Sequence, residues 1–425
     1  MGLKEIAVFG NGPAGLSSTR ELANKGYSVH LYHPDLQRVD RSVYTTDALT
    51  TKDQNVEFFP EEHIYPLPNI RILTTGGTDV RVRAGTGRYF MIDYPTILEQ
   101  LEISLEQQTN VQVHTFSAPL FRESAQFTDT PDGVEVRIDQ DVRTFDAVID
   151  ATGIESRVID KAKKGEDAEN FLVEYVYGGI YLGEFEHPDL LLVFGPGGGT
   201  SWANPSIREN HVDIAYSAWG PKNLHREFLL SAKPRLNELV NFLKQNKGIN
   251  IRNSKPEHIF SGCIRSQPQR KPRFNHIYAI GEAAGMAKPT SGDSFQRAIV
   301  AGEVLTHSID HQNPAQFHRH WKSQKYNKSD DFFLAAALAR LPFQSRGQTG
   351  GVIDQLQQFV NQGRDDVIPE VENYIIEGKL SPKLLAYILT NTSIREYFKK
   401  SLEVMSELIL KGVTLPQELP LPSVD

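Results

Sequence analysis

The sequence has one cysteine, Cys263, among its 425 residues, and it contains no long apolar run. A single cysteine excludes a disulfide framework and a cysteine-based metal site, and it is compatible with a reducing compartment. No apolar run approaches the roughly 18 residues that a membrane-spanning helix needs, so a soluble protein is expected. Acidic residues outnumber basic ones, and the formal net charge of −8 argues against nucleic acid as the main partner.

The first residues already show the pattern of a buried strand, so no cleaved signal peptide is expected. This expectation and the single cysteine predict a cytoplasmic protein, with contact to a membrane surface left open. The length allows two or three domains with a large core. The oligomeric state is not predicted by the sequence.

A glycine-rich turn between a predicted strand and a predicted helix is the first chemical signal. Residues 4–9 form a short apolar run, and the letters GNGPAG follow it. Gly10 permits a tight turn, Gly12 lets the backbone approach a pyrophosphate, and Gly15 allows close helix–strand packing. Pro13 suits a first helical turn, whose N–H groups point at an anion. The predicted contacts to a dinucleotide here are Gly10, Gly12, Pro13, Ala14 and Gly15.

The next predicted strand, residues 28–32, lacks the acid that usually holds an adenosine ribose at its end. His33 occupies that position, and Asp35 follows out of phase. His33 is either a hydrogen-bonding partner of a ribose hydroxyl or an ordinary surface histidine.

Two later stretches are predicted to add strands to the same sheet. An apolar strand at 145–149 runs into Asp150-Ala151-Thr152-Gly153, and another strand runs into the glycine- and alanine-rich end of 277–285. Three such pieces in this order describe a chain that leaves a dinucleotide-binding sheet twice and returns to it.

The segments between these pieces are predicted to be β-rich. Asp93 opens a helix, and antiparallel strands are expected at 171–176, 180–185, 190–194 and 212–218 because glycine and proline separate these apolar runs. A helix is expected near 235–243. The last hundred residues are expected to be mostly helical.

At this point the residues resemble a known family. Ile277–Gly285 resembles the second FAD motif of the para-hydroxybenzoate-hydroxylase-like flavoproteins, in which a strand ends in Gly-Asp-Ala-Ala-Gly. The resemblance implies that Glu282 takes the role of the aspartate that binds the ribityl chain of FAD. It implies further contacts from Gly281, Ala283 and Gly285.

The middle stretch, residues 150–157, resembles the middle motif of the same family, Ala-Asp-Gly-Ala-x-Ser-x-Val-Arg, in degraded form. Thr152 stands where the family has an aspartate, and the resemblance implies that Thr152 and Gly153 lie against FAD.

The segment after the third stretch favours one branch of the family. Residues 294–302 are similar to the Gly-Ile-x-x-Ala-x-x-Ser/Ala-Gly segment of geranylgeranyl reductases, and Ser294 replaces the second glycine of the family's Pro-x-x-Gly-x-Gly turn. The resemblance implies that Pro289, Gly292 and Ser294 approach the isoalloxazine.

A second similarity to the reductases lies in residues 199–205. Trp202 and Pro205 match an aromatic-x-Trp-x-Phe-Pro motif, while Thr200 and Asn204 depart from it. Trp202 is therefore a candidate for the substrate pocket, and the alternative is an ordinary tryptophan packed in a sheet. The cysteine motif of those reductases is absent, and no catalytic residue is predicted.

The resemblance implies an α/β protein with a doubly wound, Rossmann-like FAD-binding domain, an antiparallel β-sheet substrate domain and a helical C-terminal region. The expected FAD-binding domain is discontinuous and comprises residues 1–60, 95–160 and 270–312. Residues 61–94 and 161–269 are expected to form the substrate domain, and 313–425 the helical region.

The implied function is an FAD-dependent oxidoreductase that acts on an apolar small molecule, with a prenyl or other alkene-bearing compound as one class. The flavin would be reduced by NADPH, NADH or another donor. A monooxygenase or halogenase of the same fold stays open. So does a binding protein without turnover, because His33, Thr152, Glu282 and Ser294 all depart from the cofactor motifs.

Two clusters of charged or histidine side chains are interpreted as solvated surface. The basic residues Arg265, Arg270, Lys271 and Arg273 precede the third stretch, and their alternative role is to bind a phosphate of NADPH or of a lipid diphosphate. His311, His318 and His320 lack the accompanying acids of a metal site.

Overall fold

The computed structural model describes residues 4–34, 44–47, 64–74, 77, 79–83, 89–116, 125–155, 158–159, 172–194, 200–222, 225–265, 272–287, 295–322, 382–383 and 386. Among these residues, no helix is both long and apolar enough to cross a membrane. Most of the predicted helical C-terminal region lies outside the described residues.

Six of the described strands form a sheet in the order β19-β20-β12-β1-β2-β8. They are β1 (Glu5–Phe9), β2 (Ser28–Pro34), β8 (Val111–Phe116), β12 (Ala147–Asp150), β19 (Arg273–Phe274) and β20 (Ile277–Ala279). All neighbours are parallel except β19, which runs antiparallel to β20. The predicted strand at residues 4–9 is confirmed as β1. Its last four residues are consecutively buried, which is typical of a strand covered on both faces.

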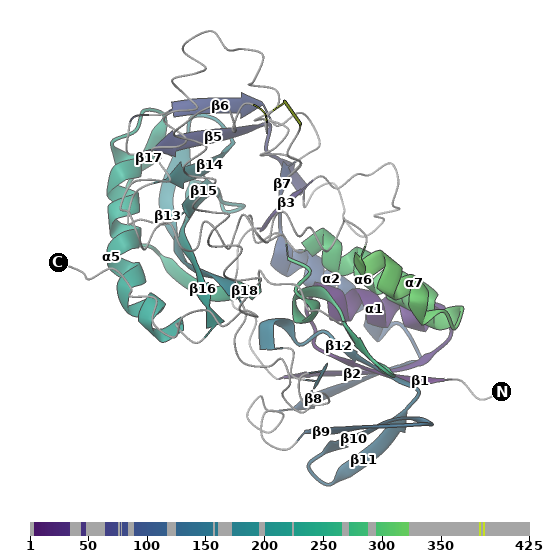
Figure 1. Cartoon of the computed structure of the whole chain (residues 1–425). Coiled ribbons are helices and arrows are strands. Elements are labelled where there is room, and N and C mark those ends of the chain that lie inside the picture. The colour runs from purple at the N-terminus through teal and green to yellow at the C-terminus, as the bar shows by residue number, and fades with distance from the viewer. Residues whose placement is uncertain are drawn as a thin grey trace.

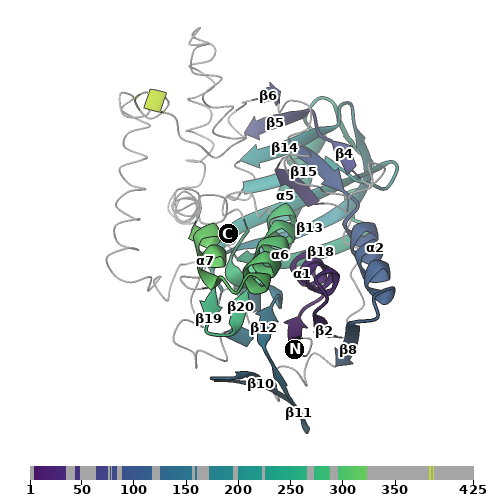
Figure 2. The same cartoon turned by 90° about the vertical axis from the view of Figure 1, so that its right-hand side faces the viewer.

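Helices cover one face of this sheet and a small antiparallel sheet covers the other (Figure 1, Figure 2). The helices are α1 (Pro13–Asn24), α2 (Tyr94–Glu106), α6 (Phe295–Asp310) and α7 (Pro314–Lys322). The small sheet consists of β9 (Gln126–Thr130), β10 (Gly133–Ile138) and β11 (Asp141–Phe145). Asp93 caps α2, as predicted, because its carboxylate accepts a hydrogen bond from the Thr96 backbone N–H.

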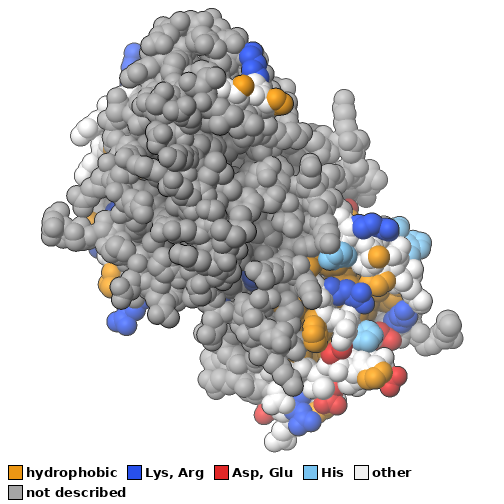
Figure 3. All heavy atoms as spheres, in the orientation of Figure 1, with side chains coloured by type: hydrophobic (Ala, Val, Ile, Leu, Met, Phe, Trp, Pro, Cys, Tyr) orange, Lys and Arg blue, Asp and Glu red, His pale blue; other side chains and the backbone are white. Residues whose placement is uncertain are grey.

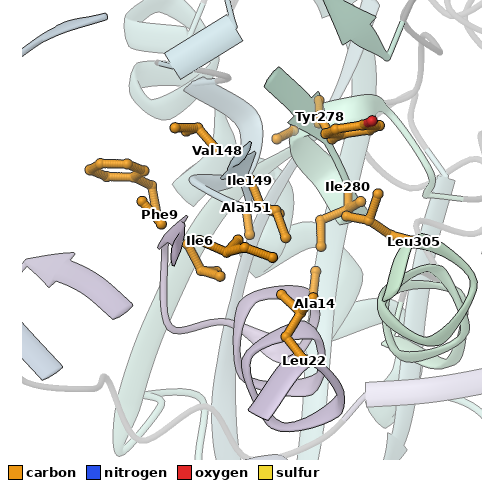
Figure 4. Packing of buried hydrophobic residues seen from close by; sticks show 14 of the residues in the cluster. Ile6, Phe9, Ala14, Leu22, Val148, Ile149, Ala151, Tyr278, Ile280 and Leu305 are labelled. Atoms are coloured by element: carbon orange, nitrogen blue, oxygen red, sulfur yellow. The ribbon is translucent and has the colours of Figure 1, made fainter. Parts of the chain in front are cut away.

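The core of this unit lies between β1, β12, β20 and the helices α1 and α6. Figure 4 shows side chains such as Ile6, Ile149 and Leu305 meeting there, and all three are completely buried. The helices α1 and α6 approach closely because α6 carries Gly302. A Cβ at this position would lie 2.9 Å from the backbone nitrogen of Ser18.

A larger mixed sheet has the order β17-β13-β16-β15-β14-β5-β6, and β18 pairs with β13 as well. Its strands are β5 (Asn69–Thr74), β6 (Asp79–Arg83), β13 (Leu172–Phe185), β14 (Asp189–Phe194), β15 (Thr200–Pro205), β16 (His211–Pro221), β17 (Ile249–Ile251) and β18 (His258–Arg265). The long helix α5 (His225–Lys244) covers its face away from the six-stranded sheet (Figure 1). Three further strands form a separate sheet: β3 (Tyr44–Asp47), β4 (Ile64–Pro66) and β7 (Tyr89–Ile92).

The prediction of two strands at 171–176 and 180–185 is wrong, because β13 runs unbroken through both. Gly178 and Gly179 do not make a turn. A Cβ on Gly178 would lie 2.5 Å from the Phe260 ring, and a Cβ on Gly179 would lie 2.6 Å from Pro256. These glycines therefore serve close side-chain packing within a strand.

The prediction of a helix at 235–243 is too short, because α5 begins at His225 and contains Pro234. Proline normally ends a helical pattern, which is why the sequence indicated a start after this residue. Phe228 and Ala232 precede Pro234 and are buried with β13 and β16. The packing of this first part against the sheet offsets the hydrogen bond that Pro234 cannot donate.

Candidate functional site

The three stretches singled out in the sequence meet at the carboxyl ends of β1, β12 and β20. Gly10 has a positive φ of 112°, and a Cβ there would lie 2.2 Å from the carbonyl oxygen of Ala151. A Cβ on Gly281 would lie 2.7 Å from Cβ of Ala14. The first stretch therefore touches both the second and the third, although they are far apart in the sequence. Such an edge of a parallel sheet is where α/β folds bind ligands.

Gly10 and Gly15 are required by the turn itself. A Cβ on Gly15 would lie 1.8 Å from the carbonyl oxygen of Gly10, so α1 can start this close to β1 only with glycine there. Gly10 also donates its backbone N–H to the carbonyl oxygen of Tyr32 at 2.8 Å, which joins the turn to β2.

Gly12 is different, because the described protein does not require a glycine at this position. Its φ of −77° and ψ of −178° are open to any residue, and no atom lies within 4 Å of an added Cβ. Gly12 precedes Pro13 and Ala14 at the start of α1, where backbone N–H groups have no helical partner. The absent side chain leaves room for a ligand to reach these N–H groups.

The second stretch is held in place by Asp150, a residue to which the sequence assigned no separate role. The carboxylate of Asp150 is completely buried and accepts hydrogen bonds from the backbone N–H groups of Thr152, Val158 and Ile159 and from the Thr152 hydroxyl. Burial raises the pKa of Asp150, and these hydrogen bonds oppose the rise. Thr152 therefore orders the loop that leads to Gly153, which has a positive φ of 73°.

Glu282 links the second and third stretches. It lies in the 3-10 helix η5 (Gly281–Ala284), and its Oε2 atom lies 3.8 Å from an ideal Cβ of Gly153. Its Oε1 atom accepts a hydrogen bond of 3.2 Å from the backbone N–H of Arg265, at the end of β18. Ala283 is completely buried, and Gly285 ends η5 in the left-handed conformation that glycine favours.

Of the remaining candidates for cofactor contact, the structure describes only His33. His33 lies at the end of β2, as expected, where it is partly buried and its Nδ1 atom is 3.1 Å from the carbonyl oxygen of Pro34. It is thus at the same sheet edge as Gly10. Pro289, Gly292 and Ser294 lie outside the described residues.

Trp202 lies on the inner face of the mixed sheet, which is the face opposite α5 and comprises Glu174, Gly178, Trp202, Ala215 and Phe260. Trp202 pairs with Ala215, while the neighbouring pair, Ala203 with Ile214, packs on the α5 side. The Trp202 ring is partly exposed and stacks on Phe260, with ring centroids 6.2 Å apart. It is therefore neither buried as a core tryptophan nor fully solvated.

A buried acid lies on the same inner face. Glu174 is 4% exposed, and burial raises its pKa to about 7 although Ser217 donates a hydrogen bond to it. The Oε2 atom of Glu174 has no hydrogen-bond partner among the described residues. The sequence did not indicate this residue.

The predicted solvated basic cluster is wrong for Arg265, which is only 5% exposed. The guanidinium of Arg273 lies over the ring of Tyr278 at 5.3 Å, and Arg273 is partly exposed. Arg270 and Lys271 lie outside the described residues. Where Figure 3 shows the described surface of the six-stranded unit, basic, acidic and histidine side chains are interspersed.

His311 lies just before α7 and His318 lies within it, and the described residues hold no cluster of three or more metal-binding side chains. His311 contacts His307, with ring centroids 4.2 Å apart. Nothing described at these histidines forms a ligand set.

The second face of the six-stranded sheet carries the antiparallel sheet β9–β11 where a doubly wound fold would carry helices, and most of the predicted helical C-terminal region lies outside the described residues. The α/β class is confirmed, with a Rossmann-like parallel sheet beside a largely antiparallel β-sheet. Several solved structures share this fold. A geranylgeranyl bacteriochlorophyll reductase-like protein from Thermoplasma acidophilum is similar with a TM-score of 0.63 and 15% identity, covering 96% of this chain and 99% of that chain.

A flavin-dependent brominase has a TM-score of 0.62 and 12% identity, covering 94% of this chain and 100% of that chain. A probable FAD-dependent monooxygenase from Pseudomonas aeruginosa has a TM-score of 0.60 and 13% identity, covering 83% of this chain and 100% of that chain. At these identities the likeness establishes the fold. No protein-family model matches the sequence, and neither does any curated protein.

Proposed function

We propose that this protein is an FAD-dependent oxidoreductase that acts on an apolar small molecule. In this proposal, residues 1–60, 95–160 and 270–312 bind the cofactor, and residues 61–94 and 161–269 contribute the sheet that faces the substrate.

The observation that carries the proposal is the free space at Gly12. Glycine at a position with ordinary backbone angles and no close neighbour lowers stability through its unfolded-state entropy, so the described structure gives no reason for it. A pyrophosphate approaching the start of α1 supplies that reason, because any side chain at this position would block the N–H groups.

The other residues of the site fit the same group. Gly153 and Glu282 lie within reach of each other beyond the turn, which suits contact with the ribityl chain, and His33 lies at the edge where an adenosine ribose is expected. FAD would supply the hydride or electron transfer. The chain would bind it, orient the substrate against it and exclude water.

The inner face supports an apolar substrate. Trp202 and Phe260 offer partly exposed rings over Gly178 and Ala215, which carry no bulky side chain. An apolar or alkene-bearing molecule would bury its surface against these rings. A nicotinamide donor, NADPH or NADH, is proposed as the source of electrons.

The similarity to monooxygenase and halogenase structures supports a second candidate, in which reduced FAD reacts with oxygen. The two candidate functions differ in which molecule reoxidises the reduced FAD: the substrate in the reductase, and oxygen in the monooxygenase or halogenase. Rapid release of hydrogen peroxide after reduction in air favours the oxygen-using enzyme, while anaerobic turnover of an alkene favours the reductase.

The first experiment is a visible absorption spectrum of the purified protein, repeated on the supernatant after denaturation. We expect a flavin spectrum and release of FAD in a near-equal molar amount. The Gly12→Val variant should lose the flavin while its melting temperature without added FAD stays close to that of the wild-type apoprotein.

Asn24→Val is the matched control, since it places the same side chain at the exposed far end of α1. This variant should keep FAD. A colourless wild-type protein that also takes up no added FAD would contradict the proposal and favour a binding module without turnover. Unchanged FAD content in Gly12→Val would overturn the assignment of the glycine turn.

A further inference from the structure

Arg265 is a buried cation at the junction of the two main sheets. It is the last residue of β18 and pairs with the buried Val173 of β13. Removing a guanidinium from water costs several kcal/mol unless its surroundings compensate. Its burial beside η5 therefore requires a specific electrostatic environment.

Two contacts connect Arg265 to η5. Its backbone N–H donates to Oε1 of Glu282 at 3.2 Å, and its guanidinium Nη1 donates to the carbonyl oxygen of Ala283 at 3.4 Å. One residue of the mixed sheet thus holds both a carboxylate and a main-chain carbonyl of the loop that is proposed to contact FAD.

Glu282 has a longer side chain than the aspartate of the family motif, and this length lets its carboxylate reach two neighbours. Oε1 of Glu282 accepts the bond from Arg265, while its Oε2 is the oxygen that lies near Gly153. The carboxylate therefore spans from the second stretch of the site to β18.

We propose that Arg265 is a positioning residue for bound FAD, which fixes η5 and makes the flavin easier to reduce through its positive charge. The inference rests on the proposed function, because it requires FAD at this site. A cation in a buried site favours the reduced flavin, which carries negative charge, over the neutral oxidised form.

The test compares three variants for FAD dissociation constant and for the reduction potential of the bound flavin. Arg265→Met removes the charge and keeps the length of the side chain, whereas Arg265→Lys keeps the charge and loses the planar fork. Arg273→Met is the matched control, because it removes the same charge from β19, where the guanidinium lies over Tyr278.

We expect at least ~10-fold weaker FAD binding in Arg265→Met, the loss expected for a hydrogen bond from a charged group. Its flavin potential should shift to a more negative value. Arg265→Lys should keep a potential close to that of the wild type with weaker binding, and Arg273→Met should change neither. If Arg265→Met retains no flavin, a melting temperature without added FAD close to that of the wild-type apoprotein supports the positioning role, and a melting temperature far below it overturns that role. The potential is then compared between the wild type and Arg265→Gln, which also lacks the charge.

Equal potentials in Arg265→Met and Arg273→Met would overturn the electrostatic part of the inference. A shift in Arg265→Lys as large as the shift in Arg265→Met would overturn that part as well. Unchanged FAD binding in Arg265→Met would overturn the positioning role. Loss of FAD from every protein including the wild type would instead count against the proposed function.

Discussion

Replacing Glu174 with glutamine should increase the stability of the variant relative to the wild type as the pH rises. The side chain is 4% exposed, and its pKa rises to about 7 from an ordinary value of 4.5, chiefly because burial disfavours the charged form. Between these two values the unfolded chain loses its proton while the folded protein retains it. The wild type therefore loses stability as the pH rises from about 4.5 to 7, and Glu174→Gln does not.

The pKa difference of about 2.5 sets an upper limit of about 3 kcal/mol on this effect. If the whole chain unfolds cooperatively, that corresponds to about 3 °C in melting temperature. The assay is the difference in melting temperature between variant and wild type at pH values from 4.5 to 8. Any constant cost of the amide cancels, because only the change of this difference with pH is interpreted.

The control is Glu184→Gln at the other end of the same strand. Glu184 is exposed and pairs with Arg252, which lowers its pKa, so its variant should gain nothing as the pH rises. A difference for Glu174→Gln that stays flat or falls between pH 4.5 and 8 would refute the reasoning, because the carboxyl would then titrate as it does in water.

Three further substitutions test the packing around the site. Gly15→Ala should sharply reduce soluble yield and melting temperature, since its Cβ would lie 1.8 Å from the Gly10 carbonyl oxygen; an unchanged melting temperature would contradict this close approach of α1 to β1. Asp150→Ala should cost about 2–4 kcal/mol in thermal or urea unfolding, because the buried N–H groups of Val158 and Ile159 lose their acceptor; a loss below ~1 kcal/mol would mean that the loop finds other partners. Gly178→Ala should destabilise by about 1–3 kcal/mol, and by less in a Phe260→Ala background, because the Phe260 ring occupies the space of the new methyl group. Additive losses in that double-mutant cycle would contradict the contact.

The first βαβ unit could be predicted from sequence almost to the residue, because its signals are local. The GNGPAG turn, Pro13 at the first helical turn and Gly26 after the last one all act on neighbouring residues. The structure places α1 at Pro13–Asn24 and gives Gly26 a positive φ of 83°. Local chemistry was sufficient here.

The errors concern residues whose role depends on distant parts of the chain. Gly178 suggested a turn because its neighbour Phe260 comes much later in the sequence, and Arg265 suggested a solvated face because η5 is not adjacent in sequence to β18. Periodicity likewise could not reveal the buried acid Glu174, since a charged residue in a strand pattern normally marks the exposed side.

The site residues themselves were predicted as types and positions, and their contact with FAD stays a prediction. What the structure adds is a distinction among the glycines. Gly10 and Gly15 are needed by the turn, while Gly12 is not needed by any described contact. That distinction is invisible in the letters GNGPAG and makes the cofactor proposal testable at one position.

The convergence of three distant stretches also has a consequence for synthesis on the ribosome. Gly281 must reach Ala14, and Gly302 must reach Ser18, before the glycine turn is enclosed. At about 5–20 residues per second, the N-terminal βαβ unit waits on the order of 15–60 seconds for residues near 300 to emerge. The apolar edge of β1 stays open to chaperones only until its partner β12 emerges, well before residue 300. The glycine turn waits longer, and nascent chains cut short before α6 would lack part of the proposed FAD site.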